Sequence, residues 1–445
     1  MPFEPQSAAL AATGAHDTAP VDPVQAVAAA LQESPTEEQR SSKRWIILGL
    51  IFSITVINFI DRQTLSVLAP VLKNAYHLTN ETYSRVVAAL QFGMMAGEFP
   101  MGWLMDRVGA RIGLSAAVLW WSAATGCQVF TRSGFQLGGV RLWMGSGEVG
   151  NYSGGMKAMA RFFSQKERTL AIGVFNGGSI VGSTVAPPLI VFLLERYGFR
   201  AAFLVPAILG AIWVPLWWIF YPRPPARAEG FVRKEVPLRA LLGHSSSWAI
   251  MGCRFFIGPV MQFYWYWIPS YLYSVRHLSL SQVGFLGWIP FFLGGFGGVL
   301  GGWAAAWLQS KGLSIYTVRR ITMYGSSLLC LTSLLVAHVH AILPALLTIG
   351  IAITADNFLS SNMFAAVTDL FPDPIVGRAT ALTGVAGGLS GLLFPLLTGV
   401  LVDHVSYRPV FLMVGLMPLL GTISLFVLGK QYRSSGIEPS PVEES

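Results

Sequence analysis

Long apolar runs separated by short polar segments make up most of the chain. A hydrocarbon core about 30 Å thick takes roughly 20 helical residues to cross, and twelve runs meet that length. They lie at 45–71, 84–105, 112–131, 136–160, 169–194, 201–221, 247–274, 283–308, 318–337, 342–368, 378–402 and 408–429. The longest internal polar segment divides them six and six. The pattern predicts an all-α membrane protein of twelve transmembrane helices in two six-helix bundles.

The polar segments suggest how the chain is organised. Residues 1–40 are rich in Ala, Pro, Gln and Glu and hold no basic residue before Arg40, unlike a secretory signal or an Arg-rich transit peptide. We expect a disordered cytoplasmic tail at 1–40, an N-terminal bundle at 41–221, a cytoplasmic loop at 222–245, a C-terminal bundle at 246–430 and a second tail at 431–445.

Composition and charge narrow the class of protein. The chain is 53% hydrophobic and only 12% charged, about half the charge of an ordinary soluble domain, which excludes a soluble globular protein and a disordered chain. The net charge of +8 first suggests nucleic acid. However, 19 of the 30 Lys and Arg residues fall on the side of the N-terminus, seven on the opposite side and four inside the runs. This bias places both termini in the cytoplasm and leaves no reason to expect a nucleic-acid partner.

The sequence holds no arrangement typical of an enzyme. Its three cysteines lie far apart inside apolar runs, where we interpret them as packing residues rather than disulfide or metal ligands. No P-loop, HExxH, GxSxG or Cys/His cluster is present. We therefore expect no catalytic residue, no metal and no cofactor, and an ion gradient as the source of energy.

A loop between the second and third runs carries a recognisable motif. GWLMDRVGAR at 102–111 resembles the loop signature of the major facilitator superfamily, and a weaker copy stands at 302–312. We interpret Gly102 as allowing close helix contact, Asp106 as capping or pairing, and Arg107 and Arg111 as lying at the cytoplasmic surface; Gly109 completes the motif. With the six-plus-six layout, the resemblance covers residues 43–430.

A finer resemblance is to the anion:cation symporter branch, and within it to bacterial hexuronate transporters. It rests on NFIDRQTLSVLAP (58–70), RLWMGSGEVGNYSGGMKAMARFF (141–163), KERTLAIGVFNGGSIVGSTVAPPL (166–189), WAIMGCRFFIGPVMQFYWYWIPSYL (248–272) and SSNMFAAVTDLFP (360–372). The resemblance implies proton coupling through acidic positions in the first and fourth helices. The chain departs from that pattern at Gly258, where an acid is frequent, at Gln262, where Trp is frequent, and at Glu98, where Gln is expected.

Eight ionisable residues fall within the runs, where a central charge costs at least about 2.5–3.5 kcal/mol. They are Asp61, Arg62, Glu98, Arg141, Glu148, Lys157, Arg254 and Asp356. At 1.5 Å per residue, Arg62, Arg141 and Glu148 lie roughly 15, 8 and 18 Å below the outer surface. Arg141 and Glu148 are seven residues apart on one helix face. These three side chains should therefore lie in neighbouring layers near the middle of the membrane.

These charges suggest a mechanism for coupling an anion to a proton. We expect Arg62 to bind the substrate carboxylate bidentately, Arg141 to hold Glu148, and Asp61 and Glu148 to carry protons. When the substrate carboxylate takes over the arginine, the acid loses its partner and is more easily protonated. The alternative is a purely structural ion-pair network.

Of three other charges, Lys157 and Glu98 are open to two interpretations each. Lys157 either reaches the cavity after a bend at Gly154 and Gly155 or anchors the cytoplasmic end of its helix. Glu98 is either a second proton site or a partner in a cytoplasmic gate. For Arg254 the simpler account is snorkelling to the cytoplasmic surface.

Neutral polar groups from both halves are candidates for recognising sugar hydroxyls, and each could equally be packing between helices. They are Asn58, Asn176, Ser179, Gln262, Tyr264, Trp265, Asn357, Ser361 and Asn362.

The sequence thus predicts a proton-coupled symporter, a monomer in the bacterial cytoplasmic (inner) membrane, that imports a sugar-acid anion by alternating access. A hexuronate is the first candidate. The alternatives are an aldonate such as galactonate, another monocarboxylate, an anion exchanger, or a sensor that binds a sugar acid without moving it.

Overall fold

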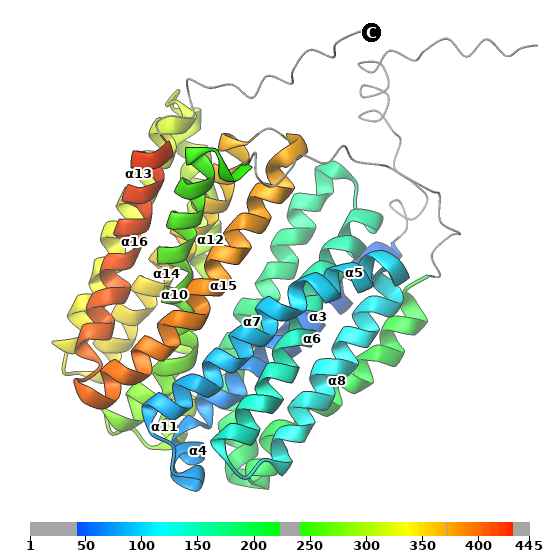
Figure 1. Ribbon diagram of the computed structural model, residues 1–445, viewed down its shortest axis with the longest axis vertical. Coiled ribbons are helices and arrows are strands. Elements are labelled where there is room, and N and C mark those ends of the chain that lie inside the picture. Colours follow the sequence, from blue (N-terminus) through cyan, green and yellow to red (C-terminus); the bar gives the residue numbers. More distant parts are fainter. Residues whose placement is uncertain (1–41, 223–240, 372, 430–445) are drawn as a thin grey trace, which may run out of the picture.

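The computed structural model of the chain describes residues 42–222, 241–371 and 373–429 (Figure 1). Every regular element in these ranges is a helix, so the all-α expectation is confirmed for them. The tails expected at 1–40 and 431–445 and most of the loop expected at 222–245 lie outside the described residues.

The first half of the chain supplies six membrane crossings. Its elements are α3 (Lys43–Val67), α4 (Ala69–Tyr76), α5 (Asn80–Cys127), the 3-10 turn η1 (Gln128–Phe130), α6 (Gly134–Phe162), α7 (Gln165–Tyr197) and α8 (Phe199–Phe220). The long α5 contains the second and third crossings. They are separated at Gly109, whose φ of 76° and ψ of 169° break the helix, a backbone conformation that glycine adopts without steric cost.

The second half also supplies six crossings, and one of them is divided between two helices. Its elements are α10 (Ser245–Ser274), α11 (Leu280–Leu286), α12 (Ile289–Ser310), α13 (Ile315–Cys330), the 3-10 segment η2 (Leu331–Ala337), α14 (Ile342–Leu370), α15 (Asp373–His404) and α16 (Arg408–Leu428). The crossing expected at 283–308 is divided between α11 and α12, and the one expected at 318–337 ends in η2.

Local sequence explains where several helices begin. The side chains of Thr79, Ser133, Ser279 and Ser314 accept hydrogen bonds from backbone N–H groups in the first turns of α5, α6, α11 and α13. Each cap satisfies a donor that the helix itself leaves free. Polar residues between the apolar runs therefore set the ends of these helices.

Length and hydropathy support the expected number of crossings. Within the described residues, nine helical segments are long and apolar enough to span a membrane, and α5 accounts for two crossings. The remaining two crossings are α6 and α10, which fall outside that set; α6 carries Arg141 and Glu148, and α10 carries Arg254. The two crossings that do not meet the length and hydropathy criteria are thus helices that carry charged residues inside the membrane.

Glycines let the central helices approach closely, and they do so in the same way in both halves. A Cβ atom added at Gly145 of α6 would lie 2.2 Å from the backbone oxygen of Leu90 in α5. One added at Gly297 of α12 would lie 2.2 Å from the backbone oxygen of Thr354 in α14. Close backbone approach at small residues is typical of membrane helix pairs.

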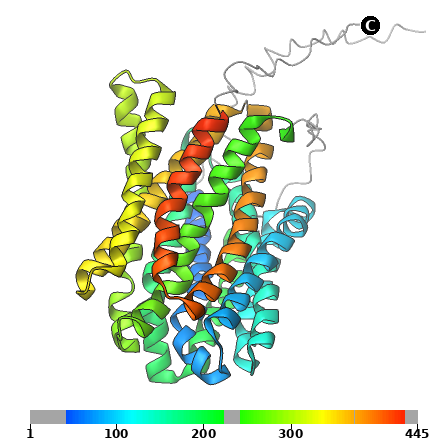
Figure 2. The ribbon, with the colours of Figure 1, turned by 60° about the vertical axis from the view of Figure 1, so that its left-hand side comes forward.

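The two halves meet mainly at one end of the molecule. We call the end where α3 begins the near end, and the end where α3 passes into α4 the far end (Figures 1 and 2). Helix α5 packs on α15, α7 packs on α11 and α12, and α3 and α4 pack on α10. In the described residues, the hydrogen bonds that join the halves all lie in the far half of the molecule, and several involve the first turns of α5.

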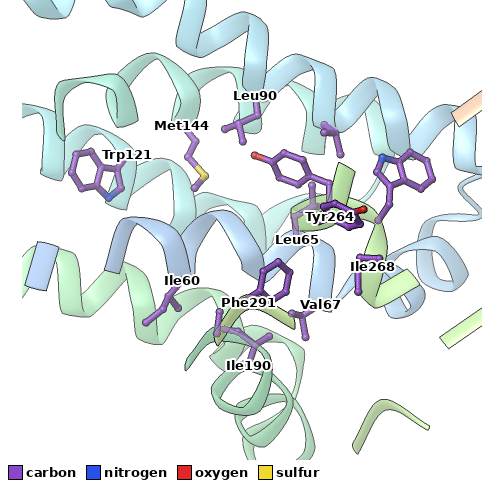
Figure 3. Packing of buried hydrophobic residues seen from close by; sticks show 14 of the residues in the cluster. Ile60, Leu65, Val67, Leu90, Trp121, Met144, Ile190, Tyr264, Ile268 and Phe291 are labelled. Atoms are coloured by element: carbon purple, nitrogen blue, oxygen red, sulfur yellow. The ribbon is translucent and has the colours of Figure 1, made fainter. Parts of the chain in front are cut away.

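One hydrophobic cluster runs through this junction. It includes Leu65 and Val67 from α3, Ile268 from α10 and Phe291 from α12 (Figure 3). Side chains from both halves are therefore buried against each other at the far end, and this packing positions the polar site that lies deeper between them.

Candidate functional site

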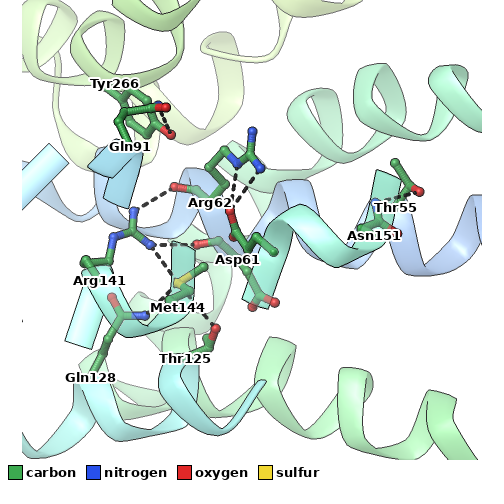
Figure 4. Close-up of polar contacts among 11 residues, drawn as sticks. Thr55, Asp61, Arg62, Gln91, Thr125, Gln128, Arg141, Met144, Asn151 and Tyr266 are labelled. Carbon is green, nitrogen blue, oxygen red and sulfur yellow. Dashed lines mark hydrogen bonds and ion pairs between the residues drawn. The ribbon is translucent and has the colours of Figure 1, made fainter. Parts of the chain in front are cut away.

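The charged centre of the first half is an ion pair between α3 and α6. Both Nε and Nη2 of Arg62 donate to the same carboxylate oxygen of Glu148, at 3.2 and 2.9 Å (Figure 4). The Glu148 side chain is fully buried and that of Arg62 is 11% exposed. The other carboxylate oxygen of Glu148 has no hydrogen bond within the described residues. One carboxylate oxygen of Glu148 thus has no hydrogen bond, and Arg62 is the more accessible residue of the pair.

The expectation that Arg141 holds Glu148 is wrong. The Arg141 guanidinium donates to the backbone oxygens of Asp61, at 3.4 Å, and Arg62, at 3.1 Å, and approaches the sulfur of Met144 (Figure 4). The fully buried Arg141 therefore holds the backbone of α3. The seven-residue spacing does align Arg141 and Glu148 on α6, but Arg62 reaches the carboxylate from α3, and Arg141 satisfies its own donors on carbonyls.

Asp61 faces away from this ion pair. Its carboxyl lies beside Trp121 and Thr125 of α5 and is completely buried, and neither oxygen meets the geometry of a hydrogen bond with the described residues. Asn58, one turn earlier on α3, is also buried and leaves its amide nitrogen without an acceptor. A buried polar group without a partner is costly, so both residues need an explanation beyond packing.

A cavity of about 380 Å³ lies between the two halves, a size suited to a small ligand. Five of the residues expected to recognise a substrate line it: Asn176, Ser179, Trp265, Asn357 and Ser361. The other lining residues are Gly173, Gly177, Ile180, Ser183, Met261, Phe291, Gly295, Gly298 and Val299. Residues of α7, α10, α12 and α14, far apart in the sequence, thus converge on one cavity that carries polar groups from both halves.

Aromatic side chains connect this cavity to the ion pair. The guanidinium carbon of Arg62 lies 4.8 Å from the centre of the Phe59 ring, and that ring packs edge-on against Trp265 at 5.3 Å. The indole nitrogen of Trp265 is buried and has no acceptor within the described residues. On the same stretch of α10, the Tyr266 hydroxyl accepts a hydrogen bond of 3.4 Å from Gln91 of α5.

Two expected ligands instead serve the interior of the second half. The Tyr264 hydroxyl is bonded to Ser333 at 2.6 Å. The Asn362 side chain accepts from Arg319 at 3.0 Å and donates to the backbone oxygen of Gly301. Each is satisfied by neighbouring helices and neither lines the cavity. Gln262 packs on Gly391 of α15 and keeps its amide oxygen buried without a donor.

Lys157 contacts the loop motif at 102–111 and does not line the cavity. Its ammonium donates to the backbone oxygen of Met105 at 2.6 Å and pairs with Asp106 at 2.8 Å. Of the two interpretations left open by the sequence, the structure supports an anchor at the near end of α6. Glu98 is exposed and lies close to Gly384 of α15 in the opposite half.

The remaining residues of the motif shape the near end of α5. Arg111 donates to the backbone oxygen of Trp218 at 2.8 Å and lies over its ring, and Arg107 lies over the ring of Trp103. The expectation for Gly102 was wrong: among the described residues nothing would lie within 4 Å of a Cβ atom added there. Gly109 is the glycine whose conformation matters, because its φ is positive.

Sequence reasoning missed several residues of the site. Phe59, Gln91 and Tyr266 were overlooked because an aromatic or amide side chain in an apolar run has no signal that distinguishes packing from binding. No group of three or more His, Cys, Asp or Glu side chains that could hold a metal ion is found in the described part of the chain.

Comparison with known proteins gives consistent matches over most of the chain. The family model of the Major Facilitator Superfamily matches residues 51–360 and 316–444. The Hexuronate transporter of Escherichia coli (strain K12) is 25% identical over 404 residues, covering 86% of this chain and 94% of that protein.

Two further relatives carry other substrates in their names. The D-galactonate transporter of Escherichia coli O6:H1 (strain CFT073) is 25% identical over 87% of this chain and 95% of its own length. A probable galactarate/D-glucarate transporter of Escherichia coli (strain K12) is 24% identical over 87% and 95%.

Among solved structures, the fold is similar to that of a bacterial homolog of the human lysosomal transporter Spinster in an inward-facing, unoccupied conformation. The TM-score is 0.68 at 17% identity, covering 88% of this chain and 96% of that one. The same protein in an inward-facing, occupied conformation gives a TM-score of 0.69 at 16% identity, with 88% and 97% covered.

Proposed function

Because the chain belongs to the major facilitator superfamily, we propose that it is a symporter that imports a sugar-acid anion together with protons by alternating access. The observation that carries this proposal is the buried pair of Arg62 and Glu148, which is connected to the cavity between the halves through the rings of Phe59 and Trp265. An arginine that is partly accessible and held by a single carboxylate oxygen can exchange that partner for the carboxylate of a substrate.

The exchange of partners would couple the two solutes. When a substrate carboxylate binds Arg62, Glu148 is left in a buried environment without its cation. A carboxyl in that situation is costly to keep charged and takes up a proton. Proton binding to Glu148 therefore favours substrate binding to Arg62, and substrate binding favours proton binding. Asp61, buried without a hydrogen bond, would be the second carrier, with Arg141 fixing the backbone between Asp61 and Arg62.

The cavity supports recognition of a hydroxylated chain rather than a plain carboxylate. Asn176 and Ser179 approach from α7, and Asn357 and Ser361 from α14, with Trp265 between them. Amide and hydroxyl groups can donate and accept, which suits sugar hydroxyls, and an aromatic ring suits the apolar face of a sugar. Because the lining comes from both halves, rocking of one half against the other would open or close the cavity around the substrate.

The orientation of transport follows from charge and packing together. The excess of Lys and Arg residues on the N-terminal side supports a cytoplasmic near end. The halves are joined at the far end, where the Asp403 carboxylate accepts from the backbone nitrogens of Asn80 and Glu81 at 3.1 and 2.7 Å. We infer that this state, joined at the far end, opens toward the cytoplasm. We further propose a monomer in the bacterial inner membrane with bundles at 41–221 and 246–430.

The substrate class is taken from the relatives and from the site. The relatives are named for hexuronates, an aldonate and aldarates, which share a carboxylate next to a hydroxylated carbon chain. A hexuronate is the first candidate from the sequence, and an aldonate such as galactonate or another monocarboxylate fits the same Arg62 contact. An anion exchanger would use the same site without net proton movement.

Proteoliposomes test the proposal directly. Galacturonate uptake should accumulate substrate when an inward proton gradient is applied and should only equilibrate without it. Replacing Glu148 by Gln should abolish accumulation and preserve counterflow of labelled substrate, because the exchange of partners at Arg62 no longer requires a proton. Counterflow with no response to the gradient in the unmodified protein would identify an exchanger, and binding without any flux would identify a sensor.

A further inference from the structure

Arg254 of α10 does not snorkel toward the near end. Its guanidinium carbon lies 3.9 Å from the position of a Cβ atom built at Gly258, one turn further toward the far end. Its Nε lies 2.9 Å from the corresponding position at Gly387 of α15. Two glycines therefore leave the room into which this side chain extends, toward the middle of the membrane, opposite to the direction that snorkelling requires.

The guanidinium of Arg254 has room for a ligand. Within the described residues no hydrogen bond or ion pair to it is found, and its side chain is partly exposed. Its carbon lies 5.4 Å from the centre of the Phe364 ring, and Asp356 is near enough to interact with it electrostatically without pairing. A partly exposed cation at this depth, with no side chain paired to it among the described residues, is available to an anion that enters from outside the chain.

Arg254 shares a helix face with the cavity beside Arg62. Arg254 and Trp265 are eleven residues apart, about three helical turns, so they project on the same side of α10. Trp265 lines the cavity, and its ring contacts the Phe59 ring that lies beside Arg62. The spacing thus turns Arg254 to the side of α10 that Trp265 shares, and Arg62 of the opposite half is reached from Trp265 through the Phe59 ring.

The rise along α10 between the level that the Arg254 guanidinium reaches and the level of Trp265 suits a substrate with a charge at each end. From the level of Gly258 to that of Trp265 is seven residues, about 10 Å along the helix. The five C–C bonds of a six-carbon chain, each about 1.5 Å, extend to roughly 6 Å between the end carbons. Contacts of about 2.8 Å at each carboxylate bring the reach to roughly 12 Å, comparable to that rise.

We propose that Arg254 binds the second carboxylate of a dicarboxylic sugar acid whose first carboxylate binds Arg62, so that the site prefers dianions to monoanions. This inference rests on the proposed transport of a sugar acid and specifies its charge. The first carboxylate must compete with Glu148, whereas the second meets a cation that has no partner within the described residues. Between the two arginines, the buried Gln262 oxygen and Trp265 indole nitrogen are left without partners for the hydroxyl groups of the chain.

Galactarate and galacturonate probe the second carboxylate, because galactarate carries a carboxylate at the carbon that is the aldehyde of galacturonate. Galacturonate closes into a pyranose ring through that aldehyde, so the open-chain monoanion galactonate is titrated beside it and should bind like galacturonate. We expect purified protein at pH 7 to bind galactarate at least about tenfold more tightly than galacturonate, measured by titration calorimetry. Arg254→Gln should remove this preference and leave galacturonate binding within about threefold of the unmodified protein. The exposed Arg200 gives the control Arg200→Gln, which should change neither.

A second variant keeps both residues that bind carboxylates. Gly258→Asp places an acid beside the Arg254 guanidinium and should weaken galactarate binding selectively. Equal loss of both ligands in the Arg254 and Gly258 variants, or unchanged preference in both, would overturn the inference. Galacturonate binding and transport with no preference for galactarate would also overturn it while leaving the proposed function intact; failure to bind either acid would instead count against the proposed function.

Discussion

The two halves carry a carboxylate at the same point of equivalent helices and surround it differently. Glu148 stands fourteen residues after the start of α6, and Asp356 stands fourteen residues after the start of α14. Glu148 forms a buried salt bridge with Arg62. Asp356 forms no salt bridge within the described residues. Arg254, which interacts with it electrostatically, extends toward Gly258 and Gly387 instead. One scaffold thus holds a closed ion pair in one half and a separated pair in the other.

This difference assigns different tasks to the halves. A ligand that binds Arg62 must displace Glu148, and the displaced carboxylate changes its affinity for protons. A ligand that binds Arg254 displaces nothing and changes no protonation state through that contact. Coupling should therefore depend on the first half, and discrimination among anions on the second.

Removing Arg62 should have the largest effect. Arg62→Gln deletes the carboxylate contact and leaves Glu148 buried without a cation, so we expect substrate affinity to fall by about 100-fold or more and uptake to be lost. Calorimetry on purified protein checks affinity apart from transport. Affinity in that variant equal to the unmodified protein would refute Arg62 as the carboxylate ligand.

The corresponding substitution in the second half should be mild. Asp356→Asn changes a carboxylate that has no ion pair, and we expect gradient-driven uptake within about threefold of the unmodified rate. Glu148→Gln in parallel should abolish accumulation. If instead Asp356→Asn abolishes accumulation and Glu148→Gln does not, the assignment of coupling to the first half is wrong.

The smallest expected effect concerns the far end and pH. Lys73 lies over the rings of Tyr83 and Trp267, and its burial there lowers its pKa to about 8, with Asp403 acting in the opposite direction. In an open far end the same ammonium would have its ordinary pKa of about 10.4. The closed state binds fewer protons between these values, so raising the pH from about 8 to about 10 should favour closure.

Spin labels on the exposed residues Asn74 and His404 can follow this equilibrium by electron resonance distance measurements, in a background without the native cysteines. We expect the closed population to rise a few-fold over that pH range. In Lys73→Met the dependence should vanish; a response of the same size in that variant would exclude Lys73 as its origin.

Much of the fold could be predicted from the sequence, because crossing a membrane imposes a length and a polarity that are visible in it. The twelve apolar runs match the described helices closely, and the expectation of a break at the GWLMDRVGAR loop holds at Gly109. The convergence of Asn176 with Asn357 could also be anticipated, since both lie near the middle of their helices.

Side-chain direction could not be predicted, and this is where the expectations failed. Helical spacing aligns Arg141 with Glu148 but does not reveal that Arg62 reaches Glu148 first. Depth alone suggested that Arg254 turns to the surface, yet the space left by glycines on its own and the neighbouring helix directs it inward. The pair Arg254 and Gly258, one turn apart, was the available signal.

The exchange of partners at Arg62 is tested most directly by counting protons during substrate binding. Purified protein in weakly buffered detergent solution at pH 7 should take up protons, approaching one per site, when saturated with galacturonate or galactarate. Glu148→Gln should bind the same ligand with proton uptake reduced by the share that Glu148 contributes. Equal proton uptake in both proteins, or none in the unmodified protein, would contradict the account.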